Sequence, residues 1–109
     1  TAQATTLALV RETLALLGDQ AVVADADILV DGSQRGPAYG VATEAMREAL
    51  LALARTEGIL LDPVYSGKAF AGMLAAIRAG CYQPGANILF VMTGGTPALY
   101  AYRDALQPA

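Results

Sequence analysis

The sequence predicts a three-layer α/β fold, in which helices cover both faces of a mostly parallel sheet. Helix-like and strand-like patterns alternate along the chain, in the order helix, strand, helix, loop, helix, strand, helix. Residues 87–92 contain five consecutive apolar side chains, a pattern typical of a central parallel strand that is buried on both faces. This segment runs directly into Gly94-Gly95 and Pro97, which predicts a strand-to-helix turn.

The N-terminal part predicts one helix and one short strand. The apolar residues of the helix recur at helical spacing, at positions Leu7, Val10, Leu14 and Leu17. Gly18 follows them where a C-terminal cap belongs, because glycine adopts the left-handed conformation that ends many helices. Residues 28–30 are then expected to form an apolar strand.

Three further helices are expected downstream. The second carries an apolar face over residues 45–53, and Thr43 is placed to cap its N-terminus. The third begins near Ser66 and ends at Gly80, and the last begins at Pro97. We see no internal repeat and no domain boundary, so residues 1–109 are expected to form one unit.

Composition narrows the possible functions. Apolar residues make up 55% of the 109-residue chain and its mean hydropathy is +0.43, which favours a piece of a larger α/β protein. No apolar run approaches the ~20 residues that a membrane span needs, so we expect no membrane association. The net charge is −3 with interspersed signs, so we expect no nucleic-acid partner.

The chain contains no histidine and a single cysteine, Cys81. Histidine is the usual general base of serine and cysteine hydrolases and the commonest transition-metal ligand. We therefore expect neither a hydrolase of that type nor a metal site within this chain. A lone cysteine fits a reducing compartment, and we expect a cytoplasmic protein. Any chemistry must use tyrosines, carboxylates, hydroxyls, backbone amides or a cofactor.

Three loops could carry such chemistry. Thr93-Gly94-Gly95-Thr96 follows the buried strand and opens a helix, where backbone amides can approach an anion, although a plain tight turn explains it equally. In the segment 62–68, Asp-Pro-Val-Tyr-Ser-Gly-Lys, the proline and glycine would hold Tyr65 on a rigid corner as an acid, base or hydrogen-bond donor, or simply as a packing tyrosine. In residues 36–40, Gly-Pro-Ala-Tyr-Gly, Tyr39 would be held in a shaped loop or an ordinary turn.

Lys68 is the only lysine of the chain. An imine-forming role would suit a lone lysine in an enzyme. Its place in the first turn of an amphipathic helix favours a solvated surface side chain instead, and that is our expectation.

Together these segments resemble a known family. Residues 36–40, residues 55–69 (Arg-Thr-Glu-Gly-Ile-Leu-Leu-Asp-Pro-Val-Tyr-Ser-Gly-Lys-Ala) and residues 89–100 (Leu-Phe-Val-Met-Thr-Gly-Gly-Thr-Pro-Ala-Leu-Tyr) are similar, in order and spacing, to the C-terminal portion of the D-cysteine desulfhydrase and aminocyclopropane-carboxylate deaminase family. This family is a branch of the fold-type II pyridoxal-phosphate (PLP) enzymes, the tryptophan-synthase-β-like group. The resemblance covers essentially the whole chain, and its long middle segment is the specific part.

The resemblance implies that the parent protein is a homodimer with PLP at the carboxyl ends of a parallel sheet. The family's cofactor-binding lysine and most of its phosphate loop would lie earlier in the protein, outside residues 1–109, so this chain alone should be inactive. Tyr39 and Tyr65 match the family's active-site tyrosines, with Ala38 in place of the usual glycine. Thr93 matches the residue beside the pyridine nitrogen. Three residues are expected to join it in binding the cofactor: Ser66, Gly94 and Gly95.

Two positions bear on the substrate. Members that open the cyclopropane ring typically carry glutamate and leucine where this chain has Ser66 and Thr93. The resemblance therefore implies β-elimination from a small amino acid such as D-cysteine, with aminocyclopropane-carboxylate deaminase or cysteate lyase as alternatives. Two hypotheses of other classes are a non-catalytic anion-binding module that uses Thr93 to Thr96, and a purely structural product of truncation.

Overall fold

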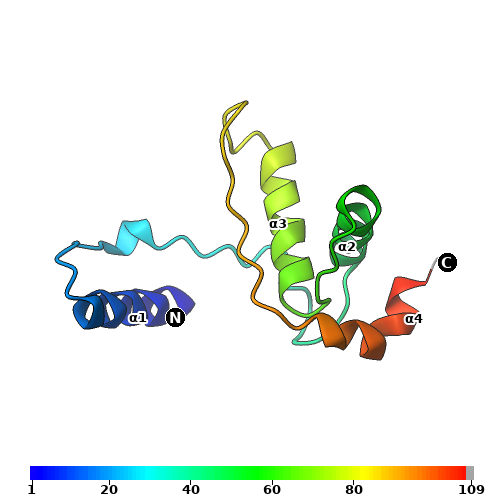
Figure 1. The fold of residues 1–109 in the computed structure, drawn as a ribbon, viewed down its shortest axis with the longest axis horizontal. Coiled ribbons are helices and arrows are strands. Elements are labelled where there is room, and N and C mark those ends of the chain that lie inside the picture. Colours follow the sequence, from blue (N-terminus) through cyan, green and yellow to red (C-terminus); the bar gives the residue numbers. More distant parts are fainter. Residues whose placement is uncertain (108–109) are drawn as a thin grey trace. The chain divides into compact units, whose positions relative to one another are not determined.

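A computed structural model of the protein describes residues 1–107 (Figure 1). These residues divide into two compact units, Thr1–Gly32 and a second unit that begins at Ser33. Every predicted site residue belongs to the second unit. The expectation of one undivided unit therefore does not hold for this structure.

The first unit consists of helix α1 (Ala2–Leu17) and the short 3-10 helix η1 (Asp25–Asp27). The Thr1 hydroxyl accepts a hydrogen bond from the Ala4 amide at 3.3 Å and caps the start of α1. Gly18 ends the helix at φ 68°, which confirms the predicted C-terminal cap.

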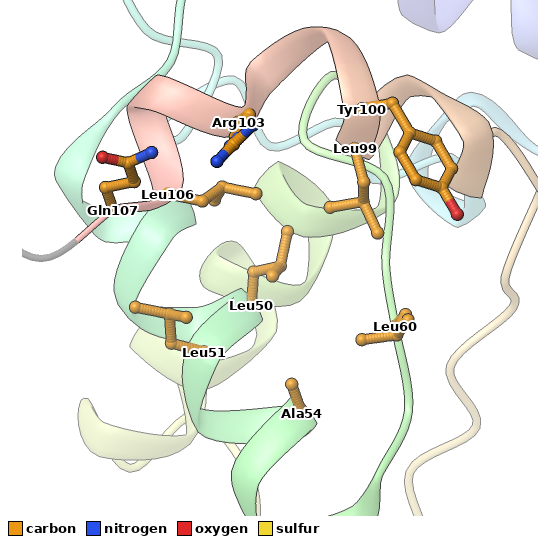
Figure 2. A pocket seen from close by; sticks show the side chains of 9 residues that line it. All are labelled: Leu50, Leu51, Ala54, Leu60, Leu99, Tyr100, Arg103, Leu106 and Gln107. Atoms are coloured by element: carbon orange, nitrogen blue, oxygen red, sulfur yellow. The ribbon is translucent and has the colours of Figure 1, made fainter.

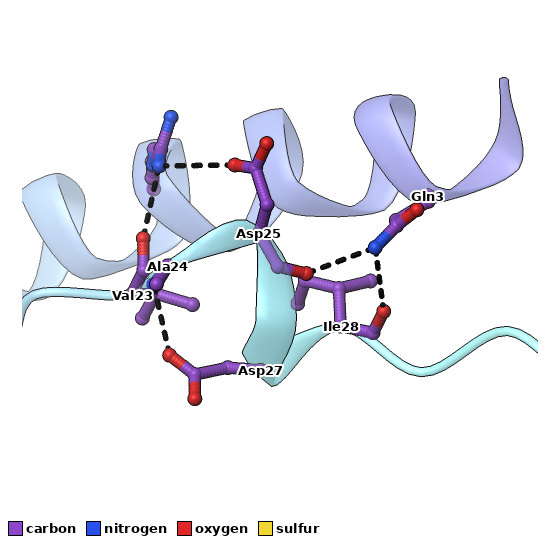
Figure 3. A network of polar contacts seen from close by, with 7 residues as sticks. Gln3, Val23, Ala24, Asp25, Asp27 and Ile28 are labelled. Carbon is purple, nitrogen blue, oxygen red and sulfur yellow. Dashed lines mark hydrogen bonds and ion pairs between the residues drawn. The ribbon is translucent and has the colours of Figure 1, made fainter.

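Polar contacts hold η1 and its flanking residues against α1 (Figure 3). The Gln3 side-chain amide donates to the carbonyls of Asp25 and Ile28, at 2.9 and 3.1 Å. The Arg11 guanidinium donates to the Val23 carbonyl at 2.9 Å and lies 3.8 Å from the Asp25 carboxylate. Leu7 is the buried residue of α1, so this unit has little apolar core.

The second unit is built on two helices that pack against each other, α2 (Glu44–Glu57) and α3 (Ser66–Arg78) (Figure 1). Thr43 caps α2 as predicted, because its hydroxyl accepts from the Met46 amide at 3.2 Å. The turn that ends at Gly80, with φ 73°, closes α3 where the sequence placed its end.

The core of this unit lies between α2, α3 and the segment that joins them. Its buried side chains are Met46, Ala49, Leu50, Leu61, Phe70 and Ala71. Met46 and Leu61 are completely buried. Burial of each large apolar side chain stabilises the unit by about 1.5–3 kcal/mol, so this cluster fixes the angle at which α3 leaves residues 61–65.

After a turn in which the Ala86 amide donates to the Gln83 carbonyl, an extended segment, residues 86–93, runs beside α3 (Figure 1). The Phe90 ring meets Phe70 of α3 edge to face, with ring centroids 5.3 Å apart. The chain then forms the 3-10 helix η2 (Thr96–Tyr102), with Pro97 in its first turn, and helix α4 (Arg103–Leu106). Pro97 is thus placed as predicted, but the helix that it opens is the tighter 3-10 type.

The predicted parallel sheet does not form among residues 1–107, where no strand is present. Residues 28–30 and 87–92 are extended but unpaired, and Leu29, Leu89 and Val91 are 91%, 89% and 69% exposed. The three-layer αβα arrangement and the interior position of 87–92 are therefore not formed by residues 1–107. A strand is defined by backbone hydrogen bonds to a neighbour, and the apolar pattern alone cannot supply that neighbour.

Within the same residues, no helix combines the length and the hydropathy required to cross a bilayer.

Candidate functional site

The structure brings the two predicted tyrosines into direct contact. The hydroxyls of Tyr39 and Tyr65 are 2.5 Å apart, and their ring centroids are separated by 5.9 Å at an interplanar angle of 61°. The two residues are 26 positions apart in the sequence, so only the fold of the second unit unites them. Both side chains are largely exposed, at 79% for Tyr39 and 57% for Tyr65, so a ligand could reach either phenol.

Tyr65 is held by a corner that the buried side chain of Asp62 organises. One carboxylate oxygen, Oδ2, accepts from the amides of Val64 and Tyr65 at 2.9 and 2.7 Å, and Oδ1 accepts from the Ser66 amide at 2.7 Å. The aspartate thus satisfies amides at the start of α3 that lack a partner within the helix. Ser66 is the first residue of α3 and Tyr65 is its N-cap, and the side chain of Asp62, four residues before the helix, supplies the acceptor for these amides.

These hydrogen bonds control the ionisation of Asp62. Burial raises the pKa of this carboxyl, but hydrogen bonds from the Ser66 side chain and from the three amides outweigh burial, so its pKa lies below the ordinary value. Asp62 is therefore a carboxylate at neutral pH. Since it is already occupied by the amides of the corner, it is a structural anion and not a free acid or base.

Two glycines allow the backbone to pack closely around this corner. A Cβ atom on Gly67 would lie 2.7 Å from the Asp62 carbonyl oxygen and 3.1 Å from Met46 Cγ. A Cβ on Gly95 would lie 3.2 Å from Asp62 Cβ, and Gly95 also has φ 87°. Glycine at these positions thus lets the Gly94-Gly95 turn lie against the aspartate.

The place where the corner meets the Gly94-Gly95 turn is called the junction, and the other predicted site residues lie along it. Ser66 is buried, and its hydroxyl oxygen lies 3.5 Å from the Gly94 carbonyl, a distance too long for a strong hydrogen bond, so its proton is better used by the Asp62 carboxylate. Thr93 and Gly94 are exposed, and open space surrounds the position that a Gly94 Cβ would take. The junction therefore unites Ser66, Gly94 and Gly95 around Asp62 and leaves Thr93 accessible.

Lys68 is not the solvated surface lysine that we expected. Its side chain is 8% exposed, and its ammonium donates to the Arg35 carbonyl at 2.8 Å. The helical pattern placed Lys68 on the surface because it counts only contacts within α3. The loop at residues 35–36 covers the side chain, and a helical pattern cannot show this.

The electrostatics of the tyrosine pair favour a neutral Tyr65. The hydrogen bond with Tyr39 is the largest cause that raises the pKa of Tyr65, and desolvation and the neighbouring Tyr39 and Asp62 charges add to it. A phenol ordinarily titrates near pH ~10, so Tyr65 keeps its proton at neutral pH. It can donate a hydrogen bond or position a ligand, and it is poorly suited to accept a proton as a base.

Sequence reasoning missed the structural parts played by Asp62 and Tyr102. Tyr102, in η2, donates through its hydroxyl to the Gly40 carbonyl at 2.5 Å, next to Tyr39. The Asp62-Pro63 pair could have marked the corner, because an aspartate before proline favours the start of a turn. Nothing local marks Tyr102, because its partner is 62 positions away.

A separate groove of about 490 Å³ lies among α2, Leu60, η2 and α4 (Figure 2). Its walls are almost entirely apolar, and Arg103 and Gln107 are its polar exceptions. The lining residues are Leu50, Leu51, Ala54, Leu60, Leu99, Tyr100, Arg103, Leu106 and Gln107. None of the predicted site residues lines this groove, and it holds no acid or base suited to catalysis.

Comparison with protein families identifies the chain. Residues 3–94 match the family described as "Pyridoxal-phosphate dependent enzyme", which is more than half of the 109 residues. The chain belongs to this family of PLP-dependent enzymes. Its α/β class and its cofactor are those of the family, which confirms the coarser part of the fold prediction and the cofactor prediction.

Two named relatives confirm the resemblance seen in the sequence. The chain is 44% identical over 82 residues to a 1-aminocyclopropane-1-carboxylate deaminase of Burkholderia vietnamiensis, covering 75% of the chain and 24% of the relative. It is 47% identical over 88 residues to a D-cysteine desulfhydrase of Salmonella typhi, covering 81% of the chain and 27% of the relative. The chain thus spans about a quarter of the length of the curated relatives that it matches.

The residues at the junction fit one edge of a PLP site. Exposed hydroxyl groups of Tyr39, Tyr65 and Thr93 can donate hydrogen bonds, and the open space at Gly94 allows a flat ring to approach the backbone. The amides at the start of α3 are taken by Asp62, so they do not hold the cofactor's phosphate. The junction therefore fits the ring of the cofactor better than its phosphate.

Proposed function

We propose that the full-length protein is a PLP-dependent lyase resembling D-cysteine desulfhydrase, and that this chain supplies the Tyr39–Tyr65 side of its active site. The observation that carries the proposal is the contact between the two phenols, whose hydroxyl oxygens are 2.5 Å apart. The family match supports the cofactor and favours this reading over an anion-binding module or a merely structural fragment.

The proposed reaction converts D-cysteine and water into pyruvate, ammonia and hydrogen sulfide. When bound, PLP supplies an electron sink for the carbon that carries the amino group. Thr93 would donate its neutral hydroxyl to the ring nitrogen, while Gly94, Gly95 and Ser66 shape the backbone around the ring. Tyr65, held as a neutral phenol, would orient the substrate, and Tyr39 would hold the Tyr65 hydroxyl in place.

The residues that we propose for substrate choice are Ser66 and Thr93. Both are neutral hydroxyl residues, and Ser66 is buried next to the Asp62 carboxylate. A neutral donor at the ring nitrogen suits prompt β-elimination better than a carboxylate, which would favour the protonated ring. The named deaminase relatives keep ring opening of aminocyclopropane-carboxylate as the second candidate.

The test is kcat/KM of the full-length holoenzyme for D-cysteine, cysteate and aminocyclopropane-carboxylate, with pyruvate or 2-oxobutanoate measured as product. We expect D-cysteine to be preferred, and the double variant Ser66→Glu, Thr93→Leu to lower D-cysteine turnover by up to about tenfold through the lost hydrogen bond. A wild-type preference for the cyclopropane substrate would refute the assignment of these two positions.

We also propose that the cofactor-binding lysine lies outside residues 1–109. Lys68 is the only lysine here, and its ammonium is engaged with the Arg35 carbonyl. Borohydride reduction of the holoenzyme followed by peptide mapping should place the pyridoxyl group on a lysine elsewhere in the protein. Stoichiometric pyridoxyl-Lys68 would refute this.

The remainder of the polypeptide is the proposed partner of the unpaired segments. The exposed apolar side chains of Leu29, Leu89 and Val91 support a sheet completed by strands from outside this chain, as in the three-layer fold that the sequence predicts. The family resemblance supports a homodimer, which light scattering of the full-length protein would detect. The free, exposed thiol of Cys81 is compatible with a cytoplasmic location.

A further inference from the structure

Lys68 and Tyr102 contact the two ends of the loop that carries Tyr39, and neither residue has a part in the proposed chemistry. We propose that they are positioning residues, which hold this loop from both ends and thereby set the contact between Tyr39 and Tyr65. This inference rests on the proposed function of the two tyrosines. It adds that the contact between Tyr39 and Tyr65 depends on residues of α3 and η2, which hold the backbone of the loop in place.

The environment of Lys68 indicates that its contact with the loop is specific. A positive charge in the first turn of a helix opposes the helix dipole, and Lys68 as a whole is only 8% exposed, so its side chain is largely removed from water. Both effects disfavour a lysine at this position. The charged hydrogen bond to the Arg35 carbonyl, at 2.8 Å and across 33 residues, is the compensating interaction.

The loop is shaped to receive this ammonium. Gly36 follows the accepting carbonyl and has φ 76°. A Cβ on Gly36 would lie 2.7 Å from Thr43 Cγ2 and 3.4 Å from Lys68 Nζ. Only glycine combines this backbone angle with so little space, so the start of the loop is fitted between Lys68 and the cap of α2.

The other end of the loop is held by Tyr102. Its hydroxyl donates to the Gly40 carbonyl at 2.5 Å, and a Cβ on Gly40 would lie 3.0 Å from that hydroxyl. Tyr102 ends η2, the helix that follows the Gly94-Gly95 turn. One end of the loop is therefore bound by Lys68 of the corner segment 62–68. The other end is bound by Tyr102, at the end of the helix that follows the Gly94-Gly95 turn.

Tyr39 depends on these two contacts because its own side chain is hardly buried. With 79% of it exposed, apolar packing does little to fix its direction, which follows from the backbone of residues 36–40. Loss of either contact should let the loop move and separate the two phenols. The expected consequence is a lower kcat, with a smaller change in KM, because the substrate can still bind but is misoriented.

The experiment uses the full-length holoenzyme with D-cysteine as substrate. Lys68→Met keeps the length of the side chain without its donor, and Tyr102→Phe removes only a hydroxyl. We expect kcat to fall about tenfold in Lys68→Met and about threefold in Tyr102→Phe, with KM changed less than about twofold. The matched controls are Arg78→Met, at the exposed end of α3, and Tyr100→Phe, which is 89% exposed in η2, and both should behave as wild type.

Two readouts separate positioning from mere stability. In a Tyr39→Phe background, Lys68→Met should lower kcat by less than about twofold further, because the contact that it positions is already gone. In NMR titrations with ¹³Cζ-labelled tyrosine, Lys68→Met and Tyr102→Phe should each lower the pKa of Tyr65, and Tyr39→Phe should do the same. Unchanged Tyr65 titration, or full additivity with Tyr39→Phe, would overturn the proposal.

The same design distinguishes failure of the inference from failure of the proposed function. If Tyr39→Phe leaves kcat unchanged, the catalytic role of the tyrosine pair is refuted, and the Tyr65 titration still decides whether Lys68 and Tyr102 hold the loop. If Tyr39→Phe lowers kcat but Lys68→Met and Tyr102→Phe lower only the melting temperature, the proposed function stands and the positioning role is refuted.

Discussion

The corner at residues 62–68 and the extended segment at residues 87–92 are both strong sequence patterns. In the structure, the corner is held by hydrogen bonds of its own, whereas the segment is not paired with another strand. The corner is closed by its own hydrogen bonds, in which one buried carboxylate accepts from three amides within four residues. The segment keeps its apolar side chains in solvent at Leu89 and Val91, and Phe90 packs on α3. The difference shows which information a short stretch of sequence carries by itself.

A capped corner is a local structure, because the acceptor and its donors are neighbours in the chain. A parallel strand is a non-local structure, because its hydrogen bonds need other strands that the sequence pattern only implies. Hence substitutions within the corner should lower the stability of the protein by themselves. Substitutions within residues 87–92 should lower it only where the neighbouring strands of the sheet are present.

The largest expected effect is at the corner. Asp62→Ala would leave three amides around a buried site without their acceptor, so we expect the free energy of unfolding of the full-length protein to fall by about 3–4 kcal/mol. Denaturant titration followed by circular dichroism measures this. Asp104→Ala, at an exposed aspartate of α4, is the matched control and should change it by less than about 0.5 kcal/mol.

The same side chain should make the corner sensitive to acid. Because hydrogen bonds lower the pKa of Asp62, its contribution to stability is present above the ordinary carboxyl pKa. That contribution is lost as the pH falls through the lowered pKa of the folded state. Asp62→Asn should reduce the fall in unfolding free energy at acid pH, measured by denaturant titration at a series of pH values. An identical pH dependence in wild type and variant would show that Asp62 does not anchor the corner.

The next effect tests the segment. If residues 87–92 form an interior strand in the full-length protein, Leu89→Ala should cost about 2–3 kcal/mol through the cavity that it leaves. Asn87→Ala, in the same segment, should cost much less. A negligible cost of Leu89→Ala would mean that the side chain remains as exposed as it is in this chain, and that the sheet is not completed there.

A smaller effect is expected from close packing at the corner. Gly67→Ala would push a methyl group to 2.7 Å from the Asp62 carbonyl oxygen, so we expect a loss of about 1–3 kcal/mol in stability. Gly32→Ala provides the control, because open space surrounds that position. Equal melting temperatures for the two variants would contradict the close approach.

The comparison also explains what could be predicted from the sequence. Helix ends were predictable where one residue determines them, as with Thr43 and Gly18, and the family was recognisable from its motifs. The resemblance assigned Tyr39 and Tyr65 to the active site, but their direct contact was not predicted. The burial of Lys68 and the contact of Tyr102 with Gly40 depend on partners 33 and 62 positions away, and no local pattern reports them.

The central claim is that the two phenols act together in a PLP-dependent elimination. The most direct measurement is the rate of pyruvate and sulfide release from D-cysteine by the full-length holoenzyme, in wild type, Tyr65→Phe and Tyr39→Phe, with Tyr82→Phe as control. We predict that Tyr65→Phe lowers kcat/KM by more than about tenfold, Tyr39→Phe by about tenfold, and Tyr82→Phe not at all. Wild-type turnover that survives unchanged in both Tyr65→Phe and Tyr39→Phe would contradict the account.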